Sequence, residues 1–222
     1  MPFQRTLPYG VGGQQVKKAL IGLLVLVAAG WAVAQERPDA LRLYRDGRYQ
    51  EAVQVCMNEL QEMPRNMDSY TVIGWSLLAL NRHEEAYNQA RKALEIAPYD
   101  QRVVQIAGEA LYYMGKNREA LAYFEQYVTL APTGGRVASV YYLMGETFIR
   151  LGQYNNADIA FSTALHFEGQ NARWWARLGY ARETGGDYAS AQAAYENALK
   201  LNSGLTEAQR GLESVKKKIT GG

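Results

Sequence analysis

The chain has 222 residues, of which 48% are hydrophobic and 21% charged, and its formal net charge is +2. This balance excludes a disordered chain and a membrane protein with several spans, and the single cysteine excludes a disulfide framework or a cysteine-rich metal module. Residues 1–34 hold three basic residues and no acidic one, so the rest of the chain holds 21 of the 24 basic residues and all 22 acidic residues. Because this body is nearly neutral, no nucleic-acid partner is expected.

Residues 1–34 have the pattern of a secretory signal peptide. An uncharged apolar run of sixteen residues, 19–34, follows Lys17 and Lys18 and ends in small residues that fit a signal peptidase. The run is shorter than the roughly 20 residues that span a bilayer. We expect export across a bacterial inner membrane, cleavage after Ala34 and a periplasmic product. The alternative is an uncleaved anchor that faces the periplasm, in which case this segment alone contacts the membrane.

The remaining chain repeats itself with a period of about 34 residues. Alanines recur at intervals of 34, 34, 37 and 34 residues, at Ala52, Ala86, Ala120, Ala157 and Ala191. Glycine or asparagine recurs in the same phase, at Gly47, Asn81, Gly115, Gly152 and Gly186. Alanine lets two helices approach closely, and glycine or asparagine tolerates the left-handed backbone that ends a helix. Such columns indicate a stack of similar units.

Each unit has the pattern of two amphipathic helices. Small or apolar residues recur at intervals of three and four, at Tyr70, Ile73, Gly74 and Leu77 and again at Ala86, Ala90, Ala93 and Leu94. Pro64, Pro98 and Pro132 fall where the second helices of their units should stop. Asn66, Asp100 and Asn171 are expected to cap the helices that follow. No segment alternates as a strand does, so the pattern predicts an all-α fold.

The units resemble tetratricopeptide repeats, which are helix-turn-helix units of 34 residues. The copy at 172–205 carries the signature of the family at Trp175, Leu178, Gly179, Ala191, Tyr195 and Ala198. The resemblance implies a right-handed α-solenoid of about five hairpins. The expected parts are a truncated repeat at 35–66, full repeats at 67–100, 101–134, 138–171 and 172–205, and a capping helix at 206–222. The first helix of the truncated repeat is expected at about residues 38–46.

Residues 134–137 lengthen the third connection by three residues, which is nearly one helical turn. One interpretation is a longer first helix or a looser turn, since surface insertions cost little loop entropy. The other is a wedge that changes the curvature of the stack between the third and fourth repeats.

The resemblance also predicts which residues line a concave binding groove. In the family the second, fifth, ninth and twelfth positions of each first helix face inward, and these positions cluster within about 80° on a helix. The candidate groove residues are Thr71, Trp75, Leu78, Arg102, Gln105, Glu109, Tyr112, Tyr142, Glu146, Arg173, Tyr180 and Glu183. Aromatic rings with few rotatable bonds suit an extended peptide or a partner helix.

The aromatic residues of this groove have a second interpretation, and one binding activity of the family is not expected here. Inward aromatic residues can instead fill the junctions between neighbouring first helices. The paired Lys and Asn with which some family members clamp a C-terminal carboxylate are absent, because Thr71, Trp75, Gln105 and Glu109 stand at those positions. Trp174 is expected on an outer or edge surface, either as a second contact patch or packed on the adjacent helix.

No enzymatic constellation is recognisable in the sequence. The two histidines, His83 and His166, occupy unrelated positions of the repeat, and Cys56 shares a column with apolar core residues. Phosphate-binding loops, zinc-ligand spacings and nucleophile elbows are missing. We therefore expect no catalytic residue, no metal and no cofactor.

The sequence thus predicts a non-enzymatic interaction scaffold or adaptor of the bacterial cell envelope, which binds a peptide or a partner helix in its groove. One alternative is a structural scaffold that assembles with copies of itself into a homo-oligomer. Another is an accessory that binds small ligands or glycans for an envelope transport or secretion system, since aromatic faces also stack on sugars.

Overall fold

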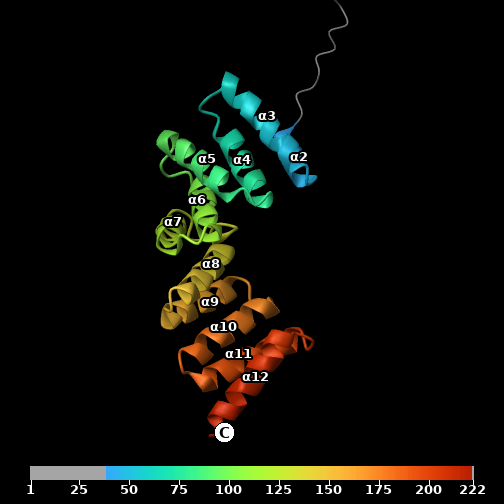
Figure 1. The fold of residues 1–222 in the computed structure, drawn as a ribbon, viewed down its shortest axis with the longest axis vertical. Helices are drawn as coiled ribbons and strands as arrows, with labels where there is room; N and C mark the ends of the chain where they lie inside the picture. Colours follow the sequence, from blue (N-terminus) through green and yellow to red (C-terminus); the bar gives the residue numbers. More distant parts are fainter. Residues whose placement is uncertain (1–38, 222) are drawn as a thin grey trace, which may run out of the picture. The chain divides into compact units, whose positions relative to one another are not determined.

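The computed structural model describes residues 39–221, and within this range it contains eleven helices and no strand (Figure 1). The expected signal peptide, its cleavage site and the anchor alternative lie outside the described residues. The helices are α2 (Ala40–Arg45), α3 (Tyr49–Glu62), α4 (Met67–Ala79), α5 (His83–Ile96), α6 (Gln101–Tyr113), α7 (Asn117–Leu130), α8 (Val137–Arg150), α9 (Tyr154–Phe167), α10 (Ala172–Thr184), α11 (Tyr188–Leu201) and α12 (Thr206–Ile219). The all-α prediction is confirmed.

Consecutive helices pair into hairpins, and the hairpins stack in chain order. The pairs are α2–α3, α4–α5, α6–α7, α8–α9 and α10–α11, and α12 packs against both α10 and α11. The second helices α3, α5, α7, α9 and α11 each have 14 residues. Helix α2 has six residues, whereas the first helices of the other hairpins have 13 or 14. The capping helix buries Ala208, Gly211 and Val215, and its outward residues are mostly polar.

The turn inside each hairpin depends on the predicted column of glycine and asparagine. Gly47, Gly115, Gly152 and Gly186 have φ between 70° and 89°, and Asn81 has φ 57°. In each turn the N–H of the next residue donates to a carbonyl five residues back, as Arg82 does to Leu77 at 2.9 Å. This left-handed C-terminal motif satisfies carbonyls that the helix leaves unpaired.

The first helices begin at the side-chain caps expected from the sequence. The Asn66 side chain accepts from the backbone N–H groups of Asp68 and Ser69, and Asp100 and Asn171 accept from Arg102 and Trp174. A capping oxygen satisfies N–H groups that have no partner inside the helix. Helix α8 begins without such a side-chain cap, so these local signals fix the start of α4, α6 and α10.

Glycines in the middle of the first helices let the paired helices meet closely. A Cβ at Gly145 would lie 2.6 Å from the Phe161 ring, and one at Gly179 would lie 2.7 Å from the Tyr195 ring. Phe161 and Tyr195 are almost completely buried. Cys56 occupies the same column and is buried, and burial together with the nearby Glu59 raises its thiol pKa to about 12. The expectation that Cys56 is a core residue is confirmed.

The insertion at residues 134–137 forms an additional turn. Gly134 donates to the carbonyl of Ala131 at 3.0 Å, and Val137 donates to the carbonyl of Gly134 at 2.9 Å. Helix α8 has 14 residues, one more than α4, α6 or α10. Of the described junctions between consecutive hairpins, the one between α7 and α8 has the least extensive contact. The repeats therefore do not pack uniformly, and the insertion coincides with the irregular junction.

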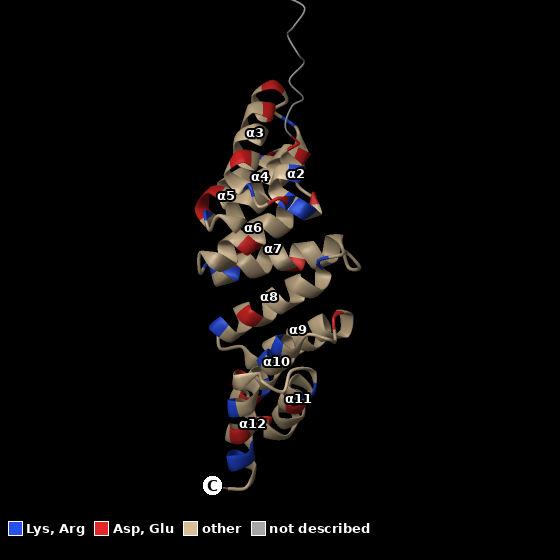
Figure 2. Ribbon diagram, turned by 90° about the vertical axis from the view of Figure 1, so that its right-hand side faces the viewer, with Lys and Arg blue, Asp and Glu red and all other residues tan. Residues whose placement is uncertain are grey.

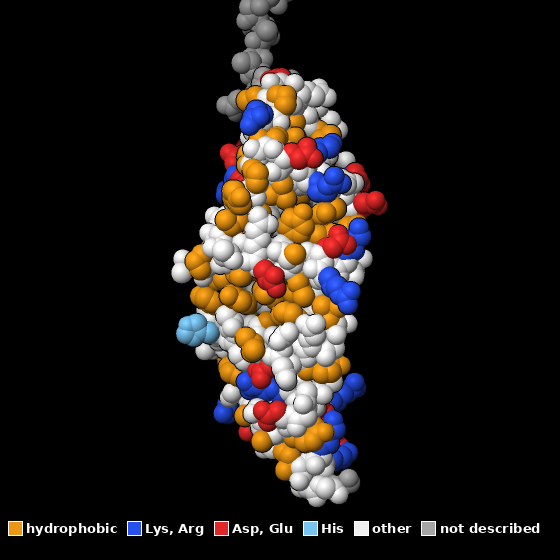
Figure 3. All heavy atoms as spheres, turned by 90° about the vertical axis from the view of Figure 1, so that its left-hand side faces the viewer, with side chains coloured by type: hydrophobic (Ala, Val, Ile, Leu, Met, Phe, Trp, Pro, Cys, Tyr) orange, Lys and Arg blue, Asp and Glu red, His pale blue; other side chains and the backbone are white. Residues whose placement is uncertain are grey.

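The first helices form the inner face of the stack. Helix α4 contacts α2 and α6, and α6 contacts α8, whereas no comparable contact joins successive second helices in the described part. Elements that lie closer together are on the inside of a curved stack. Lys and Arg are interspersed with Asp and Glu along the ribbon (Figure 2), and in the face shown in Figure 3 hydrophobic groups alternate with polar and charged side chains.

Candidate functional site

The N-terminal half of the inner face is an aromatic cluster beside a buried carboxylate. The Tyr44 ring lies 5.7 Å from the Trp75 ring and 5.5 Å from the Tyr49 ring. Glu109 accepts from Gln105 Nε2 at 2.6 Å and from the guanidinium of Arg136 at 3.3 Å. Burial raises the pKa of Tyr44, and the positive charge of Arg136 opposes this rise.

Arg102 is bound by two carboxylates at the start of α6. Its guanidinium lies 2.7 Å from Asp68 and 2.7 Å from Asp100, with the first bond reaching to α4. Arg102, a candidate groove residue, thus already has two carboxylate partners within the protein.

The junction of α6 with α8 joins two tyrosines to an arginine. Arg150 lies over the buried Tyr112 ring, with Cζ 3.8 Å from the ring centroid, and its Nη1 donates to the Tyr112 carbonyl at 2.8 Å. The Tyr113 ring meets the Tyr112 ring edge-on at 5.1 Å and stacks on the His83 ring at 4.8 Å. Stacking and cation–π contact hold these side chains in fixed positions.

The junction of α8 with α10 has an ion pair and two stacked rings. Arg177 Nε and Nη2 donate to the two carboxylate oxygens of Glu146 at 2.5 and 2.9 Å. The Arg177 guanidinium also lies 4.9 Å from the centre of the Tyr180 ring. The Tyr142 and Trp174 rings stack at 5.0 Å with an interplanar angle of 13°. Trp174 therefore packs on the adjacent helix, which is one of its two expected roles.

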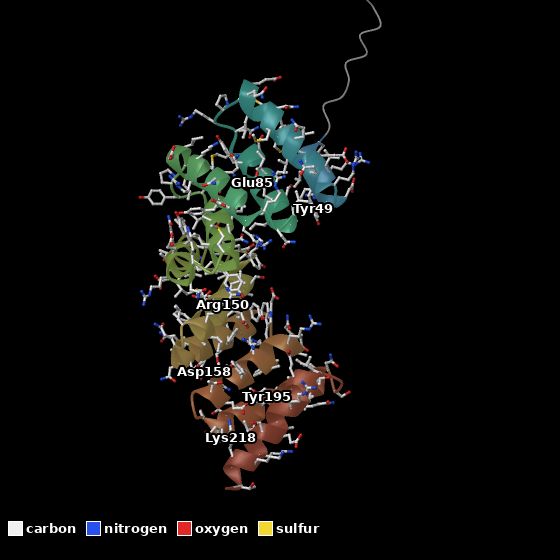
Figure 4. All side chains as sticks on the ribbon, viewed as in Figure 1. Tyr49, Glu85, Arg150, Asp158, Tyr195 and Lys218 are labelled. Atoms are coloured by element: carbon white, nitrogen blue, oxygen red, sulfur yellow. The ribbon has the colours of Figure 1, made fainter. Side chains whose placement is uncertain are left out.

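Glu183 fastens the capping helix to the last hairpin. It accepts hydrogen bonds from Tyr195 of α11 at 2.8 Å and from Ser214 and Lys218 of α12 at 2.6 and 3.0 Å. Tyr195 and Lys218 lie in this C-terminal region in Figure 4. Burial raises the pKa of Glu183, but the hydrogen bonds from Ser214, Lys218 and Tyr195 lower the pKa by more than burial raises it. The pKa of Glu183 is therefore below its ordinary value of 4.5.

This lowered pKa makes the cap sensitive to acid. A carboxylate with a lowered pKa contributes stability above its unfolded pKa of 4.5, and this contribution is lost as the pH falls through the folded value. Glu183→Gln should lower the free energy of unfolding by about 1 kcal/mol at pH 7 and have no effect near pH 2. Urea titration at both pH values measures this. Glu213→Gln, at an exposed position, should change neither value, and an equal loss for Glu183→Gln at both pH values would refute the assignment.

Four of the twelve groove residues from the sequence analysis are buried. Thr71 and Gln105 are 1% and 2% exposed, and Glu109 and Tyr112 are 9% and 7% exposed. The reason is the close approach of neighbouring first helices, shown by Gly74, where a Cβ would lie 2.7 Å from Ile106. Thr71 and Gln105 therefore cannot offer their side chains to a partner in this conformation. The half-buried residues are Trp75, Leu78, Arg102, Tyr142, Glu146 and Glu183, and the exposed ones are Arg173 and Tyr180.

Several side chains that shape the inner face were missed. Arg177 occupies a position that is apolar in the other full repeats, at Val72, Ile106 and Leu143, and this exception was a usable signal. Tyr113 and Arg150 follow one residue after the predicted stripe. Arg136 belongs to the insertion, which has no counterpart in the other repeats, so no repeat position could have identified it.

The described residues contain no group of three or more His, Cys, Asp or Glu side chains that could hold a metal ion. Across residues 39–221, no helix combines the length and the apolar character that a membrane span requires.

Two protein families match parts of the chain. The family described as "Tetratricopeptide repeat" matches residues 138–168 and 172–204, which are the α8–α9 and α10–α11 hairpins. The three preceding hairpins have the same turn with a left-handed residue, and their helices from α3 to α7 have 13 or 14 residues, as do those of the matched hairpins. The chain is a tetratricopeptide repeat protein. A second family, "Bacterial transcriptional activator domain", matches residues 29–132, which is less than half of the chain.

Similar structures share this tetratricopeptide repeat fold. MamA (41-end) from Desulfovibrio magneticus RS-1 is 20% identical with a TM-score of 0.68, over 75% of this chain and 92% of that one. YrrB, described as a TPR protein with an unusual peptide-binding site, is 16% identical with a TM-score of 0.67, over 74% of this chain and 84% of that one. Protein arginine N-methyltransferase 9 of Xenopus laevis is 30% identical over 93 residues, which are 41% of this chain and 11% of that protein. The chain therefore spans only a small part of this relative.

Proposed function

We propose that this protein is a non-enzymatic scaffold of the bacterial cell envelope that binds a peptide or a partner helix on its inner face. The tetratricopeptide fold is a protein-interaction scaffold, and binding of a peptide by YrrB supports the same activity here. The basic and apolar pattern of residues 1–34 supports export, with the mature protein in the periplasm or held at the inner membrane.

The observation that carries the proposal is a pair of exposed aromatic rings on the first helices, each held in place by neighbouring side chains. Tyr113 is 52% exposed and Tyr180 is 41% exposed. Tyr180 lies under the guanidinium of Arg177, and Tyr113 is fixed between His83 and Tyr112. Rings that are both exposed and ordered bind a partner without paying for their own ordering.

The test compares inner-face tyrosines with more exposed residues that lie outside the first helices. Peptides are selected from a display library of 12-residue sequences on the protein, and their affinity is measured by fluorescence anisotropy. The double variant Tyr113→Ala/Tyr180→Ala should bind the selected peptides with an affinity at least about thirtyfold lower than that of the wild type, because two aromatic anchors are removed.

The matched control is Tyr99→Ala/Ile159→Ala, which removes side chains that are 75% and 67% exposed away from the inner face. This variant should retain the affinity of the wild type, and circular dichroism should show the same helical content for all proteins. Loss of binding in the control, with full binding in the inner-face variant, would place the site on the outer face.

A further inference from the structure

The surface around Tyr112 and Tyr113 has buried carboxylates and exposed guanidinium groups. The side chains of Glu109 and Glu146 are 11% and 14% exposed, whereas their partners Arg136 and Arg177 are 49% and 28% exposed. Arg150 is exposed as well. Each of these carboxylates is thus more buried than its arginine, and Arg150 adds a third guanidinium, so the charge exposed here is mainly basic although the chain as a whole is nearly neutral.

Arg136 and Arg150 stand at the two ends of α8. Their Cα atoms are separated by 14 residues, which is roughly 20 Å along a helix. Burial and the negative charge of Glu109 raise the pKa of Tyr113, while the charges of Arg136 and Arg150 lower it. The Tyr113 ring contacts the Tyr112 ring, over which Arg150 lies, so Tyr113 is next to the arginine that this junction exposes.

Arg150 is the arginine of this group that has no carboxylate partner among the described residues. Its guanidinium is fixed by the Tyr112 ring and by one bond to a backbone carbonyl, and it keeps further N–H donors. A fixed guanidinium with unused donors is well suited to bind a carboxylate, because charge-assisted hydrogen bonds are stronger than hydrogen bonds between neutral groups.

We infer that the α6–α8 junction selects an acidic residue within the bound peptide, whose carboxylate pairs with Arg150 while the flanking residue packs on Tyr113. This inference rests on the proposed binding of a peptide to the inner face. It assigns a role to the irregular third connection, which supplies Arg136 and accompanies the least extensive hairpin contact.

The position of Arg150 favours a side-chain carboxylate over the C-terminus of the partner. Arg150 lies near the middle of the stack (Figure 4). Inner-face side chains continue on both sides of it, with the exposed Tyr180 toward α12 and the half-buried Tyr44–Trp75 cluster toward α2. A chain that crosses the junction can therefore extend in both directions.

The experiment uses the full chain and a 12-residue library displayed without a free C-terminus, so that only side chains can supply a carboxylate. Selected peptides should be enriched in Asp or Glu at one position. Replacing that residue by its amide in a fluorescein-labelled peptide should weaken binding to the wild type about tenfold in low salt. For the variant Arg150→Gln the same replacement should cost no more than about twofold. Arg118→Gln, on the second helix α7, should keep the tenfold effect.

The outcomes separate this inference from the proposed function. Peptides that need Tyr113 and Tyr180 but show no acidic preference, or a tenfold preference that survives Arg150→Gln, would overturn the acidic subsite alone. Failure to select any peptide would overturn it too and would also count against the proposed function. The amide comparison on the wild type does not depend on the folding of any variant.

Discussion

Replacing Gly211 by alanine should lower the free energy of unfolding of the C-terminal repeat by about 2–3 kcal/mol. The same change inside an exposed helix normally stabilises by up to about 1 kcal/mol, because glycine is a poor helix former. Here the new Cβ would lie 2.2 Å from Cζ of Tyr195. The sign of the effect therefore reports whether α12 is pressed against this ring.

Tyr195 cannot move away from the added methyl group. Its ring also lies against Gly179, where a Cβ would lie 2.7 Å from the ring, and its hydroxyl donates to Glu183. Helix α12 must then retreat and expose Ala208 and Val215, which are completely buried. Because each unit of a stacked repeat contacts only its neighbours, the damage should remain near this end.

Urea unfolding and amide hydrogen exchange measure this effect. Protection of the α12 amides should fall most, and that of α4 should change least. The matched control is Gly204→Ala in the preceding turn, where the nearest atom to the new Cβ is 3.5 Å away. A neutral or stabilising Gly211→Ala would show that α12 does not dock on Tyr195 in solution.

The repeat register could be predicted because it depends on local requirements. A left-handed residue is needed at the end of each first helix, and Gly47, Gly115 and Asn81 meet this need whatever their neighbours do. Side-chain caps such as Asn66 and Asp100 act within three residues of themselves. Such signals are visible in the sequence without any knowledge of how the hairpins pack.

The structure of the insertion could not be decided from its length. Three residues amount to nearly one helical turn, so a longer α8 and an extra turn have the same residue count. The bonds from Gly134 to Ala131 and from Val137 to Gly134 show that most of the insertion became a turn. This choice depends on tertiary packing between α7 and α8.

The inner-face positions could be predicted as a direction but not as an exposed surface. Helical angles place Gln105 and Tyr180 on the same side of their helices. Their burial then depends on how closely the next first helix approaches, and α4 and α6 meet so tightly that Gln105 is 2% exposed while Tyr180 is 41% exposed. Spacing between repeats is a property of the whole stack and is absent from any single helix.

Arg177→Leu should destabilise the protein by about 2 kcal/mol, although leucine matches the apolar residues at the equivalent positions of other repeats. The change leaves the Glu146 carboxylate, whose side chain is 14% exposed, without its cation. Removing a partner from a largely buried pair costs more than the pair itself contributes, because the remaining charge is poorly solvated. The figure is below that of fully buried pairs because Arg177 is itself 28% exposed.

The double variant Glu146→Leu/Arg177→Leu should recover most of this loss, to within about 1 kcal/mol of the wild type, since no isolated charge remains and apolar contact is gained. Chemical denaturation of the two single variants and the double variant gives the coupling. Lys217→Leu serves as control, because its pair with Glu213 is exposed and should contribute nothing measurable. Equal losses in the single Arg177→Leu variant and the double variant would instead mean that Arg177 stabilises through its contact with Tyr180, and the basic inner face would then owe its arrangement to stacking more than to charge.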